Sequence, residues 1–363
     1  MKVLIIAYSF YPEKNVGAIR TSYWAQELSK LPDVEVEVIT KCQSSESLSY
    51  KYTTVKPQRS SIFQTLIQDE GLGWKKDILA HFNAITPKPI YDVLIISGGP
   101  FLHFGLGRKF KTKGWAKKVI LDYRDPFSYN PRFKDGKLKI AIKKLFEVRM
   151  NFGADIITSV NDMCLDYISN WSGSEKIVLP NGYDERFFPD LTSLPEFDSN
   201  KTIVYPGKFY WHSHAFFNVV SRLDMRLLHV GSQDNLDNSD LISNYKYQGF
   251  IAQQEMADFL LQGKIGVIFL SDTPFESTTK VFDYLAMNMA ILIITKGPKK
   301  IGVMQELLAG YENVFWANEN EEEISEGLVF LQNLELNFLG AKAKDFSRKA
   351  SFLKLLNMIE YGA

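Results

Sequence analysis

The sequence predicts an α/β protein made of two doubly wound domains, each with a parallel sheet between layers of helices. Short β-branched strands alternate with amphipathic helices along the chain, and ten such strands would be unusual in one sheet. A linker-like segment also divides the strands into two groups. The 363 residues suit two domains, because one domain takes about 100–200 residues.

The strands follow one another at regular intervals. Six are expected in the first half, at 2–8, 34–40, 92–97, 118–123, 155–160 and 176–180. Four more are expected in the second half, at 202–207, 226–231, 264–270 and 290–295. Helical periodicity lies between them, for example at 18–31 and 253–263. Apolar strands that alternate with helices form parallel sheets through right-handed βαβ connections.

The linker-like segment covers residues 189–200, whose Pro, Ser, Asp and Asn residues follow no clean period. We therefore expect a first domain at 1–188 and a second at 189–340. Residues 341–363 are expected to form a terminal helix, and packing against the first domain is one arrangement open to it.

Composition points to a soluble globular protein. The chain is 45% hydrophobic and 23% charged, which provides two cores and argues against disorder. No apolar run approaches the ~18 residues of a membrane span, and the first residues read as a strand rather than a signal peptide. Cys42 and Cys164 make neither a disulfide framework nor a metal-ligand cluster. The expectation is a cytoplasmic protein without a bound metal.

Charge is unevenly distributed in a chain whose net charge is zero. Residues 107–149 carry 14 Lys and Arg against 4 Asp and Glu, which leaves +10. Within this stretch, residues 137–150 show helical spacing of apolar side chains flanked by lysines. The apolar positions are Leu138, Ala141, Ile142, Leu145 and Phe146, and the lysines are Lys137, Lys139, Lys143 and Lys144. One interpretation is a core-packing helix with a basic outer face, and the other is attachment to an anionic membrane surface.

Ligands of open α/β sheets bind beyond the carboxyl ends of the strands, so the residues after each strand are the candidates. After the first strand, Gly17 precedes a helix that contains Arg20. No G-x-G-x-x-G is present, so a dinucleotide fingerprint is absent. Gly17 allows either the close approach of a phosphate or sugar to the helix N-terminus or simply the loop geometry.

Two further segments of the first half place polar residues at strand ends. In SGGPFLHFGLG, a Gly-Gly-Pro turn presents His103, which serves either structure or catalysis. In LDYRDPF, Asp122, Arg124 and Asp125 end an apolar strand, where charges are costly unless they are paired or used. They form either an internal Arg–Asp pair that pins the loop or a contact to an acceptor or the other domain.

The second half offers a basic residue and an acidic helix start. Lys208 directly follows a strand-ending glycine, where phosphate contact is the favoured interpretation. In FESTTKVFDYLAMNMAILII, Thr278 and Thr279 are natural N-capping residues before a helix whose first turn would welcome a phosphate. Asp283 lies one turn further and either accepts hydrogen bonds from a ribose diol or only complements the helix dipole.

Taken in order, several segments resemble the retaining GT-B glycosyltransferases that use nucleotide-diphosphate sugars (the group 1, or family 4, type). They are YPEKNVGAIR, SGGPFLHFGLG, LDYRDPF, LPNGYD, YPGK and TTKVFDYLAMNMAIL, and they span nearly the whole chain. The resemblance implies two Rossmann-like domains facing across a cleft. It implies a nucleotide in the second domain and an acceptor bound mainly by the first.

The resemblance also implies roles for individual residues. His103 and Glu276 would be catalytic and lie near the transferring sugar. Gly17 would lie beside the diphosphate or sugar, and Arg20, Arg124 and Asp125 would face the acceptor or the other domain. The remaining donor-binding positions would be Lys208, Thr278 and Thr279 for the phosphates, Asp283 for the ribose, Gly249, Phe250 and Ile251 for the base, and Lys280 with no more specific role.

The sequence departs from the family pattern at three positions. Asp283 stands where the family usually has Glu, and Glu276 is one residue out of step with the partner acid. The usual second Lys after the Gly-Lys pair is missing, with His212 or His214 as substitutes. A weak or inactive enzyme is therefore conceivable.

The expected function is transfer of a sugar from a UDP- or GDP-type donor to a glycan or lipid-linked acceptor in polysaccharide synthesis. Retention is expected, with no metal, no cofactor and no nucleic acid, and the inner membrane face is a further possible location. Two alternatives stay open: a nucleotide-sugar epimerase of the same fold, and a non-catalytic nucleotide-sugar-binding protein. The epimerase would need more catalytic histidines and carboxylates than five His promise.

Overall fold

A computed structural model describes residues 1–60, 62–131, 133, 135–169, 173–236 and 243–361. The chain divides into two compact units. Unit 1 contains Met1–Pro180 and the terminal segment Phe352–Ala363, and unit 2 contains Asn181–Ser351. The chain thus leaves unit 1 after Pro180 and re-enters it at Phe352, whereas the sequence placed the divisions after residues 188 and 340.

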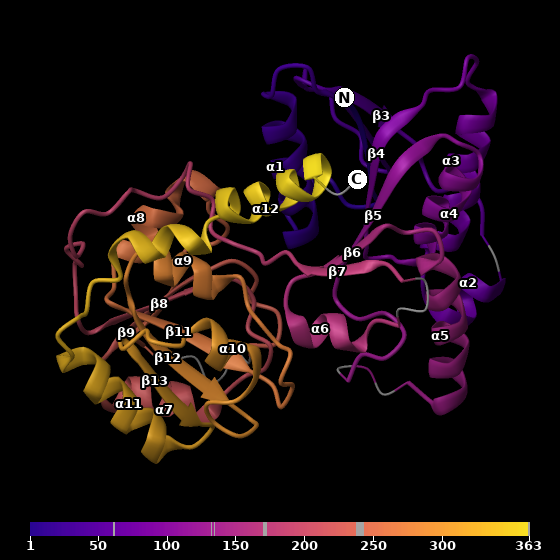
Figure 1. The fold of residues 1–363 in the computed structure, drawn as a ribbon. Helices are drawn as coiled ribbons and strands as arrows, with labels where there is room; N and C mark the ends of the chain where they lie inside the picture. Colours follow the sequence, from indigo (N-terminus) through magenta and orange to yellow (C-terminus); the bar gives the residue numbers. More distant parts are fainter. Residues whose placement is uncertain (61, 132, 134, 170–172, 237–242, 362–363) are drawn as a thin grey trace. The chain divides into compact units, whose positions relative to one another are not determined.

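Unit 1 contains a seven-stranded sheet in the order β3-β2-β1-β4-β5-β6-β7, and all of its neighbouring strands are parallel (Figure 1). The strands are β1 (Lys2–Ala7), β2 (Glu35–Thr40), β3 (Lys51–Thr54), β4 (Tyr91–Ser97), β5 (Ala116–Arg124), β6 (Ile156–Ser159) and β7 (Glu175–Val178). The helices are α1 (Val16–Ser29), α2 (Ile62–Ile67), α3 (Gly71–Ala84), α4 (Gly105–Thr112), α5 (Lys137–Asn151), α6 (Asp162–Tyr167) and α12 (Arg348–Tyr361), with a short 3₁₀ helix η1 (Leu102–Phe104). The first residues of α12, up to Ser351, still belong to unit 2.

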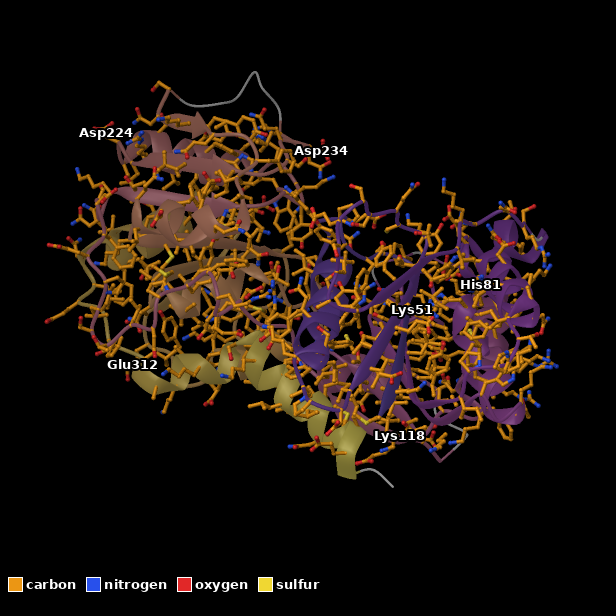
Figure 2. The ribbon with its side chains drawn as sticks, turned by 90° about the horizontal axis from the view of Figure 1, so that it is seen from above. Lys51, His81, Lys118, Asp224, Asp234 and Glu312 are labelled. Atoms are coloured by element: carbon orange, nitrogen blue, oxygen red, sulfur yellow. The ribbon has the colours of Figure 1, made fainter. Side chains whose placement is uncertain are left out.

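The two faces of this sheet carry separate cores, because the side chains of β1 alternate between them. Val3 and Ile5 pack with α1 and with Leu355 of α12 on one face, and Leu4 and Ile6 pack with the α3–α4 side on the other. The terminal helix α12 is also tied to the sheet by a hydrogen bond of 2.7 Å, donated by Lys118 Nζ of β5 to the Met358 carbonyl. Figure 2 labels Lys118.

Unit 2 contains a six-stranded parallel sheet in the order β10-β9-β8-β11-β12-β13. The strands are β8 (Thr202–Pro206), β9 (Arg226–Val230), β10 (Tyr245–Tyr247), β11 (Ile265–Leu270), β12 (Ala290–Thr295) and β13 (Val314–Asn318). The helices are α7 (His214–Arg222), α8 (Met256–Leu261), α9 (Lys280–Ala286), α10 (Gly302–Leu307) and α11 (Glu321–Asn333), with 3₁₀ helices η3 (Gln253–Glu255) and η4 (Gly340–Phe346).

The predicted fold class is confirmed, since each unit is Rossmann-like, with a parallel sheet between two layers of helices. All ten predicted strands form, and three further strands were not predicted. β3 and β10 are short, with partly or fully exposed residues, and carry no apolar alternation, while β13 at 314–318 mixes aromatic and polar residues.

Each sheet has one topological switch point, where the strand order reverses. It lies between β1 and β4 in unit 1 and between β8 and β11 in unit 2. Connections leave such a point in opposite directions and open a crevice beyond the carboxyl ends of the two strands. The loops after β1, β4, β8 and β11 are therefore the places where ligands are expected.

Helix α5 forms as predicted, and part of its predicted apolar stripe packs on the core. Leu138 is 76% exposed and Leu145 is 68% exposed, whereas Lys143 and Glu147 are buried. The inward face also carries polar contacts: Glu147 accepts hydrogen bonds from the Ser128 N–H and hydroxyl, at 3.2 and 2.7 Å. Ile142, Phe146 and Met150 pack against the core of unit 1, so the core-packing interpretation holds for one side of α5, while Leu138 and Leu145 stay outside that core.

Candidate functional site

Arg124 stands at the switch point of unit 1, at the end of β5. Its Nη2 donates a hydrogen bond to the Gly98 carbonyl in the turn after β4. A Cβ atom at Gly17 would overlap the guanidinium, and one at Gly99 would come within 2.6 Å of Nη2. Gly99 also has a φ of +78°, so both glycines are needed to let the arginine lie against the backbone.

Several features mark Arg124 as more than a strand-end residue. It has a φ of +58°, which is uncommon for a residue with a side chain, and the β5–β6 register shifts between Asp122 and Arg124. Its Nε is buried without a hydrogen-bond partner. No carboxylate of the described residues lies within ion-pair distance of it. The guanidinium therefore keeps donors available for an anionic group near Gly17.

Arg20, predicted to face an acceptor or the other domain, is instead buried inside unit 1. Its Nη2 lies 3.1 Å from Asp122 Oδ1 and donates to the Leu179 carbonyl at 2.7 Å. Asp122 also accepts the hydroxyls of Ser97 and Thr158, both at 2.9 Å. The network joins α1 to the ends of β4, β5, β6 and β7, so an internal Arg–Asp pair does exist, with Arg20 rather than Arg124.

Asp125, which follows Arg124, is exposed.

The turn before His103 is held in place by Asp69, which lies in a segment where the sequence showed no motif. The buried carboxylate of Asp69 accepts three backbone N–H groups, from Gly71 at 2.9 Å, Phe101 at 2.7 Å and Leu102 at 3.1 Å. Burial raises the pKa of Asp69, and these hydrogen bonds oppose the rise.

His103 is fully buried and packs edge-on against Trp74, with ring centroids 5.0 Å apart. Its Nε2 lies 3.1 Å from the Ser97 carbonyl, so Nε2 carries the proton and donates it, while Nδ1 is buried without a partner. Burial lowers the pKa of His103 to about 3, and the nearby Arg124 charge contributes. The ring is therefore neutral at pH 7, and its predicted catalytic role stays a prediction.

This depressed pKa predicts an acid-sensitive unit 1. In the unfolded chain the histidine has its ordinary pKa of about 6.5 and takes up a proton below that pH, whereas the buried ring in the folded protein stays neutral. The stability is therefore full above pH 6.5 and is lost as the pH falls from there toward 3. Between pH 7 and 5 the loss should be about 2 kcal/mol. Urea unfolding at the two pH values measures it. His103→Gln should flatten the pH dependence, and His81→Gln, on the outer helix α3 (Figure 2), should leave it unchanged.

The turn after β8 forms the base of the candidate site in unit 2. Gly207 has a φ of +119°, and its carbonyl accepts a hydrogen bond of 2.7 Å from His229 Nε2. Gly231 packs directly on Gly207, since a Cβ there would lie 2.7 Å from the same carbonyl. Lys208 follows with an exposed side chain whose ammonium pairs with Asp234 at 3.0 Å. His229 was not singled out from the sequence, although its place as the next-to-last residue of β9 could have indicated it.

Lys280 lies beside this turn. Its ammonium stands over the rings of Tyr205 and Tyr210, at 4.9 and 5.4 Å from their centroids, and a Cβ on Gly207 would lie 3.1 Å from it. The residue is half-buried, and burial lowers its pKa to about 8 while the charge of Asp283 opposes this. Lys280 thus adds a recessed cation beside the turn that carries the exposed Lys208.

Asp283 lies one turn further along α9 and is also half-buried. No side chain or N–H of the described residues donates a hydrogen bond to its carboxylate. Burial raises the pKa of Asp283 to about 7, against the pull of Arg348 and Lys280. A carboxylate that is recessed, accessible and without donors is suited to hydroxyl groups of a ligand.

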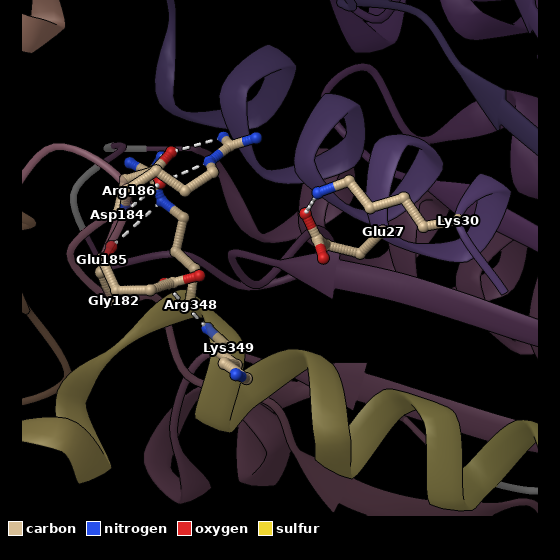
Figure 3. Close-up of polar contacts among 8 residues, drawn as sticks. All are labelled: Glu27, Lys30, Gly182, Asp184, Glu185, Arg186, Arg348 and Lys349. Carbon is tan, nitrogen blue, oxygen red and sulfur yellow. Dashed lines mark hydrogen bonds and ion pairs between the residues drawn. The ribbon is translucent and has the colours of Figure 1, made fainter. Parts of the chain in front are cut away.

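A buried charge cluster lies behind Asp283. Asp184, 1% exposed, receives two hydrogen bonds from Arg186, at 2.7 and 2.6 Å, and one from Arg348 at 2.8 Å (Figure 3). Arg348 also donates to the Gly182 carbonyl at 3.1 Å. The sequence showed only a turn at LPNGYD. The cluster holds Arg348 where its charge acts on Asp283.

The loop 271–279 is ordered by Glu276, which is 6% exposed. Its carboxylate accepts the N–H of Ser271 at 2.9 Å and the Ser271 hydroxyl. Thr278 is buried, and Thr279 precedes α9 without a side-chain capping hydrogen bond, so the expected N-cap does not form. The seven residues of α9 also make a short dipole. Glu276 is thus committed to the loop in this structure.

The predicted base-binding positions form an exposed corner. Gly249 has a φ of +78°, and its carbonyl accepts the Gly231 N–H at 2.8 Å. Phe250 is 81% exposed, and Ile251 packs partly against the core. A small pocket also opens between loop 271–276 and residues 297–301, with Thr295 and Trp316 in its wall.

Unit 2 therefore brings together Gly207, Lys208, Lys280 and Asp283, and unit 1 brings together Gly17 and Arg124 with the turn that leads to His103. Arg20 and Glu276 point into their own units. Within the described ranges, no group of three His, Cys, Asp or Glu side chains is arranged to hold a metal ion. No helix in those ranges has the length and apolar character needed to cross a membrane.

Comparison with protein-family models and with the sequences of curated proteins finds no match. Solved structures do match along the chain. Sucrose-phosphate synthase from Thermosynechococcus elongatus is 12% identical with a TM-score of 0.69, covering 99% of this chain and 98% of that one. A lipopolysaccharide outer core galactosyltransferase is 11% identical with a TM-score of 0.63, covering 99% of both chains.

A UDP-GlcNAc 2-epimerase from Methanocaldococcus jannaschii is 10% identical with a TM-score of 0.57, covering 99% of this chain and 100% of that one. At such identities the likeness establishes the fold alone. The chain has the GT-B fold of two Rossmann-like units, as the sequence predicted.

Proposed function

We propose that this protein transfers a sugar from a nucleotide-diphosphate donor to a glycan or lipid-linked acceptor in polysaccharide synthesis, with retention at the anomeric carbon. The observation that carries the proposal is the meeting of Lys208, Lys280 and Asp283 around Gly207, at the switch point of unit 2. Two cations and one carboxylate without donors match a diphosphate and a ribose diol. Neighbours of the same fold include a galactosyltransferase and a sucrose-phosphate synthase.

Each group then has a chemical task. Lys280 and Lys208 would neutralise the diphosphate, and their charges would stabilise the nucleoside diphosphate as it leaves, which is where negative charge develops. Asp283 would orient the nucleoside through its ribose. The tyrosine rings around Lys280 keep its ammonium in place and partly desolvated, so its interaction with a phosphate is stronger than in water. The chain thereby supplies its own cations for the leaving group.

Lys280 takes the place of the missing second Lys in this proposal. His212 and His214 were the substitutes that the sequence suggested, but His212 stacks on Phe217, with centroids 4.8 Å apart and an interplanar angle of 6°. Lys280 instead lies beside Gly207. The diphosphate can therefore meet two cations although the segment after Lys208 is aromatic.

Unit 1 would bind the acceptor. Arg124 is the residue of that unit with donors to spare near Gly17, so an acceptor with a phosphate or carboxylate group fits it best. His103 is neutral at pH 7 and lies behind the same turn.

A nucleotide-sugar epimerase is the second candidate, because an epimerase shares the fold. A non-catalytic sugar-nucleotide binder is the third, because Glu276 is committed to its loop. A thermal-shift panel of UDP-, GDP- and ADP-sugars tests binding, and one nucleotide class should stabilise the protein. Analysis of the product then separates the three: transfer releases nucleoside diphosphate, epimerisation keeps it attached, and a binder changes nothing. The absence of stabilisation by every class would contradict the proposed donor site.

The perturbed pKa values predict a bell-shaped pH dependence of donor binding. Asp283 must be ionised to accept hydroxyl groups, so affinity should fall as the pH drops below about 7. Lys280 must be protonated, so affinity should fall again above about 8. Titration calorimetry across this range measures both limbs. Asp283→Asn should remove the acidic limb and leave the alkaline one, and an unchanged acidic limb would assign it to another group.

A further inference from the structure

Helix α5 and Phe152, which directly follows it, expose apolar side chains at regular spacing on the outer side. Leu138, Leu145 and Phe152 are seven residues apart and 76%, 68% and 57% exposed. Residues at this spacing share one face of a helix, and the exposed Ala141 lies between the first two. We call Leu138, Ala141, Leu145 and Phe152 the outer ridge. Single exposed apolar residues are ordinary, but a line of them along four turns marks an interaction surface.

Cations flank the outer ridge. Lys137 and Lys144 are exposed and lie one residue before Leu138 and Leu145, which places both about 100° around the helix on the same flank. Arg149 is exposed between Leu145 and Phe152. From the neighbouring helix α4, the Arg108 guanidinium stands 5.0 Å from the centre of the Phe152 ring.

The other two lysines of α5 do not belong to this surface. Lys143 is buried with its ammonium 2.5 Å from Asp135, and Lys139 lies 2.8 Å from the same carboxylate and 2.9 Å from Gln68. Their charge is already neutralised inside unit 1. The sequence treated the four lysines as equivalent, and the structure separates them into an outer pair and an inner pair.

We propose that the outer ridge docks unit 1 on an anionic bilayer surface. The leucines and Phe152 would enter the boundary between headgroups and acyl chains, and Lys137, Lys144, Arg149 and Arg108 would meet the phosphates. A helix that is apolar on one side and basic beside it binds in this way, lying in the interface without spanning it. The charge complementarity comes from the exposed cations beside the outer ridge, Lys137, Lys144, Arg149 and Arg108.

The charges argue against a second copy of the chain as the partner. In a twofold dimer formed through α5, the same face of the two copies would be in contact. The outer lysines and Arg149 of both copies would then lie close together, and α5 has no exposed acidic residue that could pair with them. Nucleic acid is also a poor match, because the line is mostly aliphatic and offers no platform for bases. The inference goes beyond the proposed sugar transfer and does not depend on it, because vesicle binding needs no nucleotide.

Co-sedimentation of the whole chain with vesicles tests the proposal. Binding is expected to mixed phosphatidylglycerol–phosphatidylcholine vesicles at low salt, to weaken with added salt, and to be much weaker to phosphatidylcholine alone. Leu138→Ser with Leu145→Ser should lower partitioning by about tenfold or more without changing the net charge. The matched apolar control is Val329→Ser with Leu353→Ser, which are 44% and 49% exposed on α11 and α12, and it should bind like the unaltered chain.

The lysines give a second, independent comparison. Lys137→Gln with Lys144→Gln should lower partitioning by about 25-fold, since each cation near an anionic surface contributes about 1 kcal/mol, or about fivefold. Lys139→Gln removes an inner lysine and should change binding little. Circular dichroism and the nucleotide thermal shift report folding in all variants. The proposal is overturned if the unaltered chain fails to bind at low salt, if the leucine variant binds normally, or if that variant instead dissociates a dimer.

Discussion

Asp283→Ala is expected to abolish the thermal stabilisation that the correct nucleotide sugar gives to the protein. The carboxylate is half-buried, receives no hydrogen bond from the described residues, and lies between the charges of Lys280 and Arg348. A ribose diol would supply the two donors that it lacks. A hydrogen bond to a charged group is worth roughly 1.5–3 kcal/mol, so the loss of two should weaken donor binding by at least about 10²-fold.

The substitution should leave the free protein at least as stable, because it removes a carboxylate whose pKa burial has raised to about 7. Loss of ligand response without loss of folding is therefore the diagnostic result. Asp258→Ala is the matched control, since Asp258 is an exposed residue of α8 in the same unit. A full nucleotide shift in the Asp283→Ala variant would refute the ribose assignment, while a reduced melting temperature without ligand would make Asp283 a structural residue.

Asp122→Ala is expected to lower the free energy of unfolding by about 3–5 kcal/mol, a large loss for a single change in unit 1. It removes one partner of a buried ion pair, in which Arg20 is 5% exposed and Asp122 is 0% exposed. The guanidinium would keep its bond to the Leu179 carbonyl but lose its counter-charge, and the hydroxyls of Ser97 and Thr158 would lose their acceptor. An uncompensated buried charge is the main source of the loss.

For a unit of this size, 1 kcal/mol shifts the melting temperature by roughly 2–4 °C, so a decrease of about 10 °C is expected. Thermal unfolding followed by tryptophan fluorescence measures it. Glu27→Ala is the control on the same helix, because the Glu27–Lys30 pair lies at the surface (Figure 3) and such a pair contributes less than about 1 kcal/mol. Equal effects of the two substitutions would show that the buried pair contributes no more than a surface one.

The two sheets could be predicted because most of their strands are recognisable from a short run of neighbouring residues. Runs such as those of β1 and β12 are apolar at every central position, which only a strand buried on both faces requires. β3 was missed because this short edge strand has no fully buried residue and carries no such run. The switch points followed from strand order and could be expected once the strands were known, so the positions of Lys208 and Asp283 were predictable.

The contacts within the sites could not be predicted in the same way. Arg20 and Asp122 are 102 residues apart in the chain, and the residues around each give no sign that the two are in contact. The sequence instead offered Arg124, two residues from Asp122, as the natural partner. For α5, the period showed a helix but not that Lys143 and Glu147 turn inward, because their partners, Asp135 and Ser128, lie in the loop before the helix. The position of Lys280 could not be predicted for the same reason, since the two tyrosine rings that its ammonium contacts come from the end of β8 and the loop after it.

The return of the chain to unit 1 at Phe352 has a consequence for biosynthesis. Unit 2 is one uninterrupted stretch, so all of its core is available as soon as residue 351 has left the ribosome. Unit 1 begins first yet lacks Phe352, Leu355 and Ile359 from the core around α1 until those residues have been made. Its nascent sheet thus has one apolar face incompletely covered throughout the synthesis of unit 2, and a chaperone that shields this face would be needed most during that interval.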